Sequence, residues 1–246
     1  MIKSEVESNS GEKTVRHATQ GDAEAIATLF CRAFPSLYLS AFGGKEIENL
    51  LPLVTQLYRE GHLPYEHTLV SERGGEVIGV MSLNLGESLG AATLASYSKT
   101  VRASLPFFRA LRAIVGGIAT ERFLNARIPR APDLLYIEAL AVAETERGKG
   151  TGTLLLQRAE EYALQHSRSL VTLHVLRRNA DARRLYERFG FREISPDAYL
   201  HSSHSLIAPL VRLHDPGNRW VASLMEKNLK ASDADRRRES GEEIPQ

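Results

Sequence analysis

The segment that decides the fold is LLYIEALAVAETERGKGTGTLLLQRAEEYALQ, residues 134–165. It begins with an apolar run typical of a buried strand, passes through a glycine-rich turn at residues 147–152, and ends in an amphipathic pattern that predicts a helix. Such a turn presents free backbone N–H groups at a helix N-terminus, where they and the helix dipole attract phosphate oxygens. Residues 147–152 are therefore a candidate phosphate-binding turn.

The spacing of the turn residues excludes two common phosphate-binding motifs. A P-loop requires a lysine directly after its final glycine, whereas Gly150 is followed by Thr151. A dinucleotide-binding turn requires a third glycine, and Thr153 stands at that position. The alternative to a ligand site is that these glycines serve only a tight turn.

The rest of the sequence predicts an α/β protein, with a mixed sheet and helices on its faces. The expected strands cover residues 14–19, 67–73, 76–85, 134–142 and 170–176, with two weaker strands at 206–213 and 220–225. The expected helices cover residues 22–34, with Asp22 as a cap, and residues 44–59, 151–165 and 180–190. Residues 88–130 are rich in alanine, leucine and arginine and predict a helical insertion.

The composition is that of one globular domain with polar ends. The chain has 246 residues, of which 43% are hydrophobic and 25% charged, and this suffices for a sizeable core. We expect a single domain over residues 14–229, with disordered segments at 1–13 and 230–246 because both ends are polar. The formal net charge of +1 provides no global positive field that would favour nucleic acid.

The sequence predicts a cytoplasmic protein without a transmembrane segment. Its longest apolar stretch, around residues 105–119, is interrupted by Arg109 and Arg112, and a span needs about 20 apolar residues. No N-terminal run has the form of a secretion signal. The one cysteine, Cys31, cannot form an intrachain disulfide. The oligomeric state stays open, a homodimer included.

Two motifs carry a resemblance to a known family. Arg147-x-x-Gly150-x-Gly152 resembles the R/Q-x-x-G-x-G/A motif of the GCN5-related N-acetyltransferase (GNAT) superfamily. A later run resembles the N-x-x-A-x-x-L-Y-x-x-x-G-F pattern of that family, with Asn179, Ala182, Leu185, Tyr186, Gly190 and Phe191. The resemblance is strongest over residues 134–191, weaker over 14–85, and absent from 88–130 and the C-terminal tail.

The resemblance implies a specific fold and co-substrate. The fold would be a mixed, mostly antiparallel sheet that splays between its fourth and fifth strands, with residues 88–130 inserted between the third and fourth. Acetyl-CoA would be the co-substrate, and no metal is expected. The implied cofactor-binding residues are Leu140, Ala141, Val142, Arg147, Gly148, Lys149, Gly150, Thr151, Gly152 and Asn179. From the residues alone, Leu140 and Val142 are equally core positions, and Asn179 is a candidate helix N-cap.

Tyr186 is the candidate general acid that the resemblance places next to the sulfur. A phenol has a pKa of about 10 and is therefore protonated at neutral pH, so it can supply a proton to a thiolate. The alternative is that Tyr186 only anchors the core through its ring.

The general base has two candidates, with bulk water as a third. Glu138 is an isolated carboxylate in an apolar strand, and simple alternation places it on the same face as Tyr136 and Leu140. His174 precedes Tyr186 by 12 positions, where some N-terminal-amine acetyltransferases of the superfamily carry a carboxylate. A histidine there departs from that pattern, and it is as readily a hydrogen-bonded residue of the sheet.

The leading hypothesis is an N-acetyltransferase that transfers an acetyl group from acetyl-CoA to a primary amine by direct attack in a ternary complex. The insertion at 88–130 favours a small-molecule acceptor, because added helices narrow the acceptor site. Two alternatives are a non-catalytic acyl-CoA-binding module and a protein acetyltransferase acting on a chain terminus or a lysine.

Overall fold

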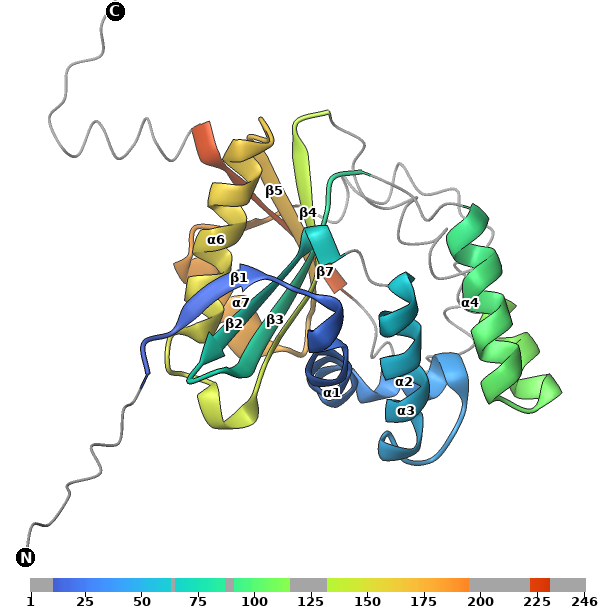
Figure 1. Ribbon diagram of the computed structural model, residues 1–246. Helices are drawn as coiled ribbons and strands as arrows, with labels where there is room; N and C mark the ends of the chain where they lie inside the picture. Colours follow the sequence, from blue (N-terminus) through green and yellow to red (C-terminus); the bar gives the residue numbers. More distant parts are fainter. Residues whose placement is uncertain (1–10, 63–64, 87–90, 116–131, 195–221, 231–246) are drawn as a thin grey trace, which may run out of the picture.

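The computed structural model describes residues 11–62, 65–86, 91–115, 132–194 and 222–230. At its centre lies a seven-stranded sheet with the strand order β1-β2-β3-β4-β5-β7-β6 (Figure 1). The strands are β1 (Thr14–His17), β2 (Thr68–Arg73), β3 (Glu76–Asn84), β4 (Leu134–Val142), β5 (Leu170–Leu176), β6 (Arg192–Glu193) and β7 (Ala222–Asn228). In this described part, β4 and β5 are parallel and the other neighbouring strands are antiparallel. The expected mixed, mostly antiparallel sheet is confirmed.

Helices lie on both faces of the sheet, as expected (Figure 1). One face, called here the α6 face, is covered by α6 (Thr151–Gln165) and α7 (Ala180–Arg188). The other, the α1 face, is covered by α1 (Ala23–Ala33), which packs on β3 and β4. Beyond α1 lie α2 (Pro35–Phe42), α3 (Leu51–Leu57) and α4 (Ala91–Ser104), followed by a helical segment at residues 107–115.

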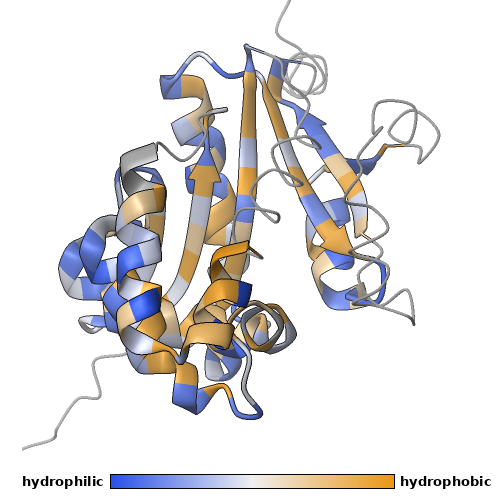
Figure 2. Cartoon of the chain, turned by 90° about the vertical axis from the view of Figure 1, so that its right-hand side faces the viewer, coloured by the Kyte–Doolittle hydropathy of each residue, from blue (hydrophilic) through white to orange (hydrophobic). Residues whose placement is uncertain are grey.

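Alternating apolar positions form the core on the α6 face. Figure 2 shows hydrophobic stretches alternating with hydrophilic ones along the helices and strands. Val171, Leu173 and Val175 of β5 point to this face and are buried. The helical face expected from the sequence is buried against them, with Leu155, Leu156, Ala159, Tyr162 and Ala163. Burial of one leucine side chain stabilises the fold by about 1.5–3 kcal/mol relative to exposure.

The helices beyond α1 have an apolar cluster of their own, which we call the lobe. Its buried members include Phe42 of α2, Leu53 of α3 and Val101 of α4. α1 contributes to both sides, because Ile26 packs towards the sheet while Ala27 packs into the lobe. The described part of the predicted insertion is therefore helical and packs against α3. Within the described residues, no helix is both long and apolar enough to span a bilayer.

One helix beyond α1 was not predicted, and another is shorter than expected. The helix predicted over residues 22–34 is α1, and the second helix α2, which was not expected, begins at Pro35. Proline has no N–H to donate and a fixed φ, so it starts a helix more readily than it continues one. The helix predicted over 44–59 is the shorter α3, preceded by a 3₁₀ turn at Glu48–Leu50.

Several expectations lie outside the described residues. These are the tails at 1–10 and 231–246, the strand at 206–213, and the end of the insertion at 116–130. Residues 11–13 and 230 fall inside the described part. The predicted domain boundaries stay predictions.

A β-bulge at Glu138 changes which way β4 presents its side chains. Ser82 pairs with Ala139 and Leu83 with Ile137, so Glu138 is an extra residue between them. An extra residue breaks the simple alternation of side chains along a strand. Tyr136 therefore faces away from the α6 face, whereas Leu140 packs on it. The prediction that Tyr136, Glu138 and Leu140 share one face is wrong for Leu140.

The predicted splay between the fourth and fifth strands is present. β4 pairs with β5 only over Leu134–Ile137 and Leu170–Leu173. Past this point β4 continues along β3, and β5 continues along β7. The two parallel strands thus part at the bulge, and the edge of β4 beyond Ile137 has no paired strand in the described part of the chain.

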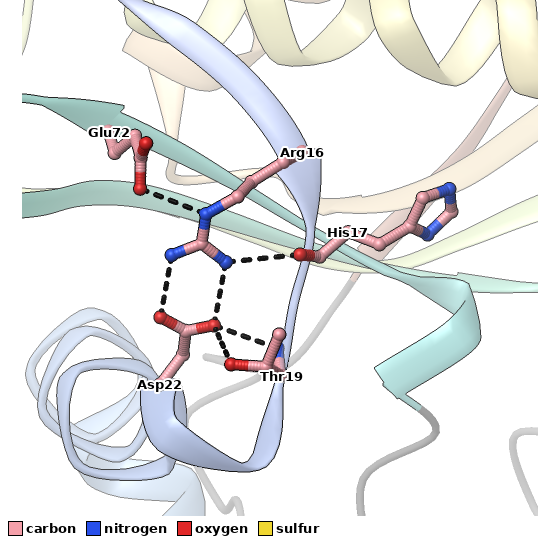
Figure 3. A network of polar contacts seen from close by, with 5 residues as sticks. All are labelled: Arg16, His17, Thr19, Asp22 and Glu72. Atoms are coloured by element: carbon pink, nitrogen blue, oxygen red, sulfur yellow. Dashed lines mark hydrogen bonds and ion pairs between the residues drawn. The ribbon is translucent and has the colours of Figure 1, made fainter. Parts of the chain in front are cut away.

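A partly exposed ion pair links the corner between β1 and α1 (Figure 3). The Arg16 guanidinium donates to both carboxylate oxygens of Asp22, at 2.8 and 2.9 Å, and its Nε donates to Glu72 at 2.9 Å. Asp22 also accepts from the backbone N–H and the hydroxyl of Thr19, at 2.7 and 2.9 Å. The side chain of Asp22 therefore binds Arg16 of β1 and Thr19 of the preceding turn, and it does not cap α1 as expected.

Replacing Asp22 with Asn should destabilise the protein by about 1–2 kcal/mol at pH 7. This value is lower than that of a fully buried ion pair, because solvent reaches Arg16 and weakens the attraction. The hydrogen bonds from Arg16 lower the pKa of Asp22 to about 2, whereas an unfolded Asp has a pKa of about 3.9. The stabilisation is thus present above pH 4 and disappears as pH falls towards 2. Urea unfolding of both proteins across this range measures it, with Glu24→Gln on the exposed surface of α1 as control. A gap that stays constant down to pH 2 would contradict the assignment.

Candidate functional site

The glycine-rich turn needs glycine at two positions for its backbone shape. Gly148 and Gly150 have φ angles of +74° and +84°, a left-handed conformation that residues with a Cβ rarely adopt. Apart from the chain neighbours, no atom of the described residues lies within 4 Å of where a Cβ would stand at either position. The backbone is therefore exposed on the side where a ligand would approach, directly before α6 begins at Thr151.

Four of the six backbone amides in residues 147–152 are available to a ligand. The amides of Arg147 and Lys149 donate to the carbonyls of Glu144 and Glu146, at 3.3 and 3.4 Å. Those of the remaining residues have no acceptor in the described part of the chain: Gly148, Gly150, Thr151 and Gly152. They lie at the positive end of a helix of 15 residues, so the turn is suited to bind an anion.

The buried carboxylate of Glu146 is paired with three basic side chains beneath the turn. Glu146 is only 2% exposed and is paired with Arg73 at 2.7 Å, Lys149 at 3.3 Å and Lys13 at 3.4 Å. Burial alone would raise the pKa of Glu146, but the hydrogen bonds from Lys149 and Lys13 and the charge of Arg73 outweigh it and lower the pKa. Three cations thus surround one carboxylate, and the turn region carries an excess of positive charge.

Two predicted cofactor-binding residues, Thr151 and Gly152, also serve packing inside the protein. A Cβ at Gly152 would meet the side chain of Leu185 at 3.0 Å, so this glycine lets α7 pack closely on α6. The Thr151 side chain is buried, and its hydroxyl lies 3.0 Å from the Nζ of Lys13. Of these two residues only the amides face outward. Arg147, by contrast, is an exposed side chain with a weak ion pair to Glu144 at 3.6 Å.

The end of β4 offers backbone groups to the opening. Leu140 and Val142 pack their side chains on the α6 face, while Ala141 packs on the α1 face. The amide of Ala143 donates to Ile78 of β3 at 2.9 Å. Since successive residues direct their N–H groups to alternate edges of a strand, Leu140 and Val142 direct theirs away from β3. These amides point to the edge that β5 has left.

Tyr186 lies on α7 within the core of the α6 face. Its side chain is 7% exposed, and its ring contacts that of Phe191 edge-on with centroids 5.9 Å apart. Burial raises the pKa of Tyr186 to about 12. The phenol is therefore protonated over the whole physiological range, as a proton donor must be.

The two candidate bases lie on the other face of the sheet. Glu138 accepts hydrogen bonds from Ser82 Oγ at 2.9 Å and Asn84 Nδ2 at 2.8 Å. His174 Nδ1 lies 2.9 Å from the hydroxyl of Tyr136. The structure thus brings both candidates to the α1 face near the parting of β4 and β5, and it places Tyr186 on the opposite side of the sheet.

Asn179 is the N-cap of α7. Its Oδ1 accepts from the amide of Ala182 at 3.2 Å, which is the local role that the sequence offered as the alternative to cofactor binding. One side-chain oxygen has two acceptor sites, so the cap does not prevent a further contact.

Sequence reasoning missed residues that come from distant segments. Lys13 and Arg73 reach the turn through Glu146. Tyr38 of α2 and Tyr58 after α3 share a hydrogen bond of 2.7 Å between their hydroxyls. Burial raises the pKa of Tyr58, and the negative charge of Glu138 raises it further. Glu146, a glutamate inside the polar turn, was the one sequence feature that could have indicated Lys13 and Arg73. No sequence feature indicated Tyr38 and Tyr58.

Comparisons with known proteins agree with this geometry. The sequence matches the acetyltransferase (GNAT) family over residues 24–191, more than half of the chain. It is 39% identical over 72 residues to Acetyltransferase Atu2258 of Agrobacterium fabrum (strain C58), a match that covers 29% of this chain and 51% of that protein. The chain thus spans about half the length of the curated relative it matches.

Solved structures show the same fold. An N-acetyltransferase from Staphylococcus aureus Mu50 superposes with a TM-score of 0.58 at 20% identity, over 87% of this chain and all of that one. PaiA N-acetyltransferase from Thermoplasma acidophilum, solved in complex with coenzyme A, superposes with a TM-score of 0.50 at 13% identity, over 88% of this chain and 99% of that one. With the family match extending from α1 through the glycine turn to Phe191, the chain belongs to the GNAT acetyltransferase family.

Proposed function

We propose that the protein transfers an acetyl group from acetyl-CoA to the primary amine of a small molecule. The observation that carries this proposal is the open edge of β4, which leads directly into a turn with four free amides. An extended amide-bearing chain ending in a diphosphate fits that combination: the strand edge offers backbone hydrogen bonds, and the turn offers anion donors. The coenzyme A bound by the PaiA enzyme has this form.

The described residues fit acetyl-CoA as the co-substrate, which supplies an activated acetyl thioester. The amides of Gly148, Gly150, Thr151 and Gly152 would hold the diphosphate. The β4 edge at Leu140–Val142 would pair with the pantetheine amides. Asn179, at the start of α7, would contact the same arm.

The chain supplies three functions to the transfer. An amide of Leu140 or Val142 would donate to the carbonyl oxygen as negative charge develops there. Glu138 would take a proton from the amine as its nitrogen bonds to the acetyl carbon, with His174 as the alternative base. Tyr186 would return a proton to the sulfur as the carbon–sulfur bond breaks, so charge and atoms balance.

Direct attack by the amine is supported by the state of the only cysteine. Cys31 is fully buried, and burial raises its thiol pKa to about 12. A thiol in that state is a poor nucleophile because the thiolate is the reactive form. A small acceptor is supported by the lobe, whose helices stand next to the α1 face that carries Glu138.

The decisive experiment is a screen of amines with acetyl-CoA, read as free thiol released. Turnover with small primary amines is expected. Tight coenzyme A binding without transfer to any amine would identify a binding module instead, and transfer only to peptide termini or protein lysines would identify a protein acetyltransferase.

Replacing Tyr186 with Phe should lower kcat by about 100-fold or more, the range of general acid catalysis. KM for acetyl-CoA should hardly change, because only a hydroxyl is removed. Tyr97→Phe is the matched control, since Tyr97 in the lobe is also a tyrosine whose pKa burial raises to about 12. Equal kcat values in the Tyr186 variant and the wild type would remove Tyr186 as the acid.

Replacing Glu138 with Gln should lower kcat by roughly 10- to 100-fold while leaving coenzyme A affinity intact. The Gln side chain has nearly the same shape but cannot take a proton, and only its oxygen can still accept a hydrogen bond. Steady-state rates and a binding isotherm measure the two effects, with the exposed hairpin variant Glu76→Gln as control. If the loss appears in His174→Gln and not in Glu138→Gln, the base is His174.

Replacing Gly150 with Val should weaken coenzyme A binding by more than about tenfold, because the Cβ strains the turn and intrudes on the ligand side. Gly61→Val is the matched control: Gly61 has the same φ of +84° and open space around it, but lies in the lobe. Calorimetric titration with coenzyme A compares the two. Unchanged affinity in the Gly150 variant would contradict the assignment of the turn.

A further inference from the structure

Lys13 reaches from the residue before β1 into the glycine turn. Its ammonium lies 2.7 Å from the carbonyl oxygen of Lys149, 3.0 Å from the hydroxyl of Thr151 and 3.4 Å from a carboxylate oxygen of Glu146. The first two contacts are hydrogen bonds and the third is an ion pair. The side chain is only 20% exposed. Lys13 is thus engaged by the protein itself and is not free to contact a ligand.

The bond to the Lys149 carbonyl determines where the next amide points. In a trans peptide the C=O and the following N–H point in opposite directions, and the described chain contains no cis peptide bond. Holding the Lys149 carbonyl towards Lys13 therefore turns the Gly150 N–H away from it. That amide is one of the four without an acceptor in the described residues.

The peptide between Lys149 and Gly150 has few restraints on its ligand side. Gly150 lacks a Cβ, and apart from its chain neighbours no described atom lies within 4 Å of where one would stand. The preceding peptide is held by the Lys149 amide, which donates to the carbonyl of Glu146, and Lys13 holds the Lys149 carbonyl. Arg73 and Lys149 balance Glu146, so removing Lys13 would leave that carboxylate still paired.

We propose that Lys13 is a positioning residue for the diphosphate-binding turn: it orients the Gly150 amide towards the ligand without touching it. The inference rests on the proposed function, because the ligand is coenzyme A. It also predicts which part of the ligand is affected. The diphosphate should depend on Lys13, and the pantetheine arm on the β4 edge should not.

The test compares Lys13→Met with the wild type by calorimetric titration of coenzyme A and 3′-dephospho-coenzyme A. Both carry the diphosphate, and both should bind about five- to tenfold more weakly to the variant. S-acetylpantetheine lacks the diphosphate, so its kcat/KM as acetyl donor should be the same in both proteins. With acetyl-CoA, KM should rise and kcat at saturation should stay. Lys45→Met, at an exposed lysine after α2, is the control for loss of charge.

Two further measurements separate positioning from its alternatives. Long-range attraction of the diphosphate by the Lys13 charge would fade at high salt, whereas a misoriented amide leaves the affinity ratio unchanged up to about 0.5 M salt. Lys13→Cys treated with 2-bromoethylamine rebuilds an ammonium of nearly the same length and should restore affinity. Cys31 is buried, and its raised thiol pKa, about 12, keeps it unreactive.

The outcomes are distinct. If the wild type fails to bind coenzyme A, the proposed function falls and this inference with it. If the wild type binds and Lys13→Met binds equally well, the inference alone is wrong. Equal weakening with S-acetylpantetheine, or no recovery after alkylation, would show a general effect on folding instead of positioning and would also overturn it.

Discussion

The site depends on one constraint: among the described residues, β4 past Ile137 keeps a hydrogen-bonded strand on only one side. Backbone amides and carbonyls must find partners, and an unpaired strand edge buried in a protein is costly. Here that edge runs into the turn before α6, so strand edge and helix terminus form one continuous set of donors. The bulge at Glu138 marks the point where this begins and brings a carboxylate to the opposite face.

The same backbone arrangement separates the two halves of the chemistry. The α6 face holds the phenol of Tyr186 within its apolar core, and the exposed glycine turn lies at the start of α6. The α1 face holds the polar groups Glu138, Tyr136 and His174. A thioester lying between the parted strands would be reached from one side by its proton donor and from the other by the amine. Two groups of opposite function therefore need not compete for the same proton.

Much of this architecture could be predicted from the sequence, because it depends on local patterns. The spacing of apolar residues and the placement of the glycines predicted the strand–turn–helix unit. The resemblance carried by two short motifs predicted the splayed sheet. The errors have physical causes: the bulge at Glu138 defeats simple alternation, and Pro35 begins a new helix where one was expected to end. The cations around Glu146 were invisible because Lys13 and Arg73 meet only in the folded chain. The hydrogen-bonded pair of Tyr38 and Tyr58 was missed for the same reason.

The separate apolar cluster of the lobe has a consequence for how such a protein can change. α1 joins the two apolar clusters, since Ile26 packs into the core of the sheet and Ala27 into the core of the lobe. Mutations that repack Phe42, Leu53 or Val101 would change the lobe without disturbing the apolar layer beneath the turn. Under the proposed function, substrate preference can therefore drift through evolution while the residues that hold the acyl donor stay intact.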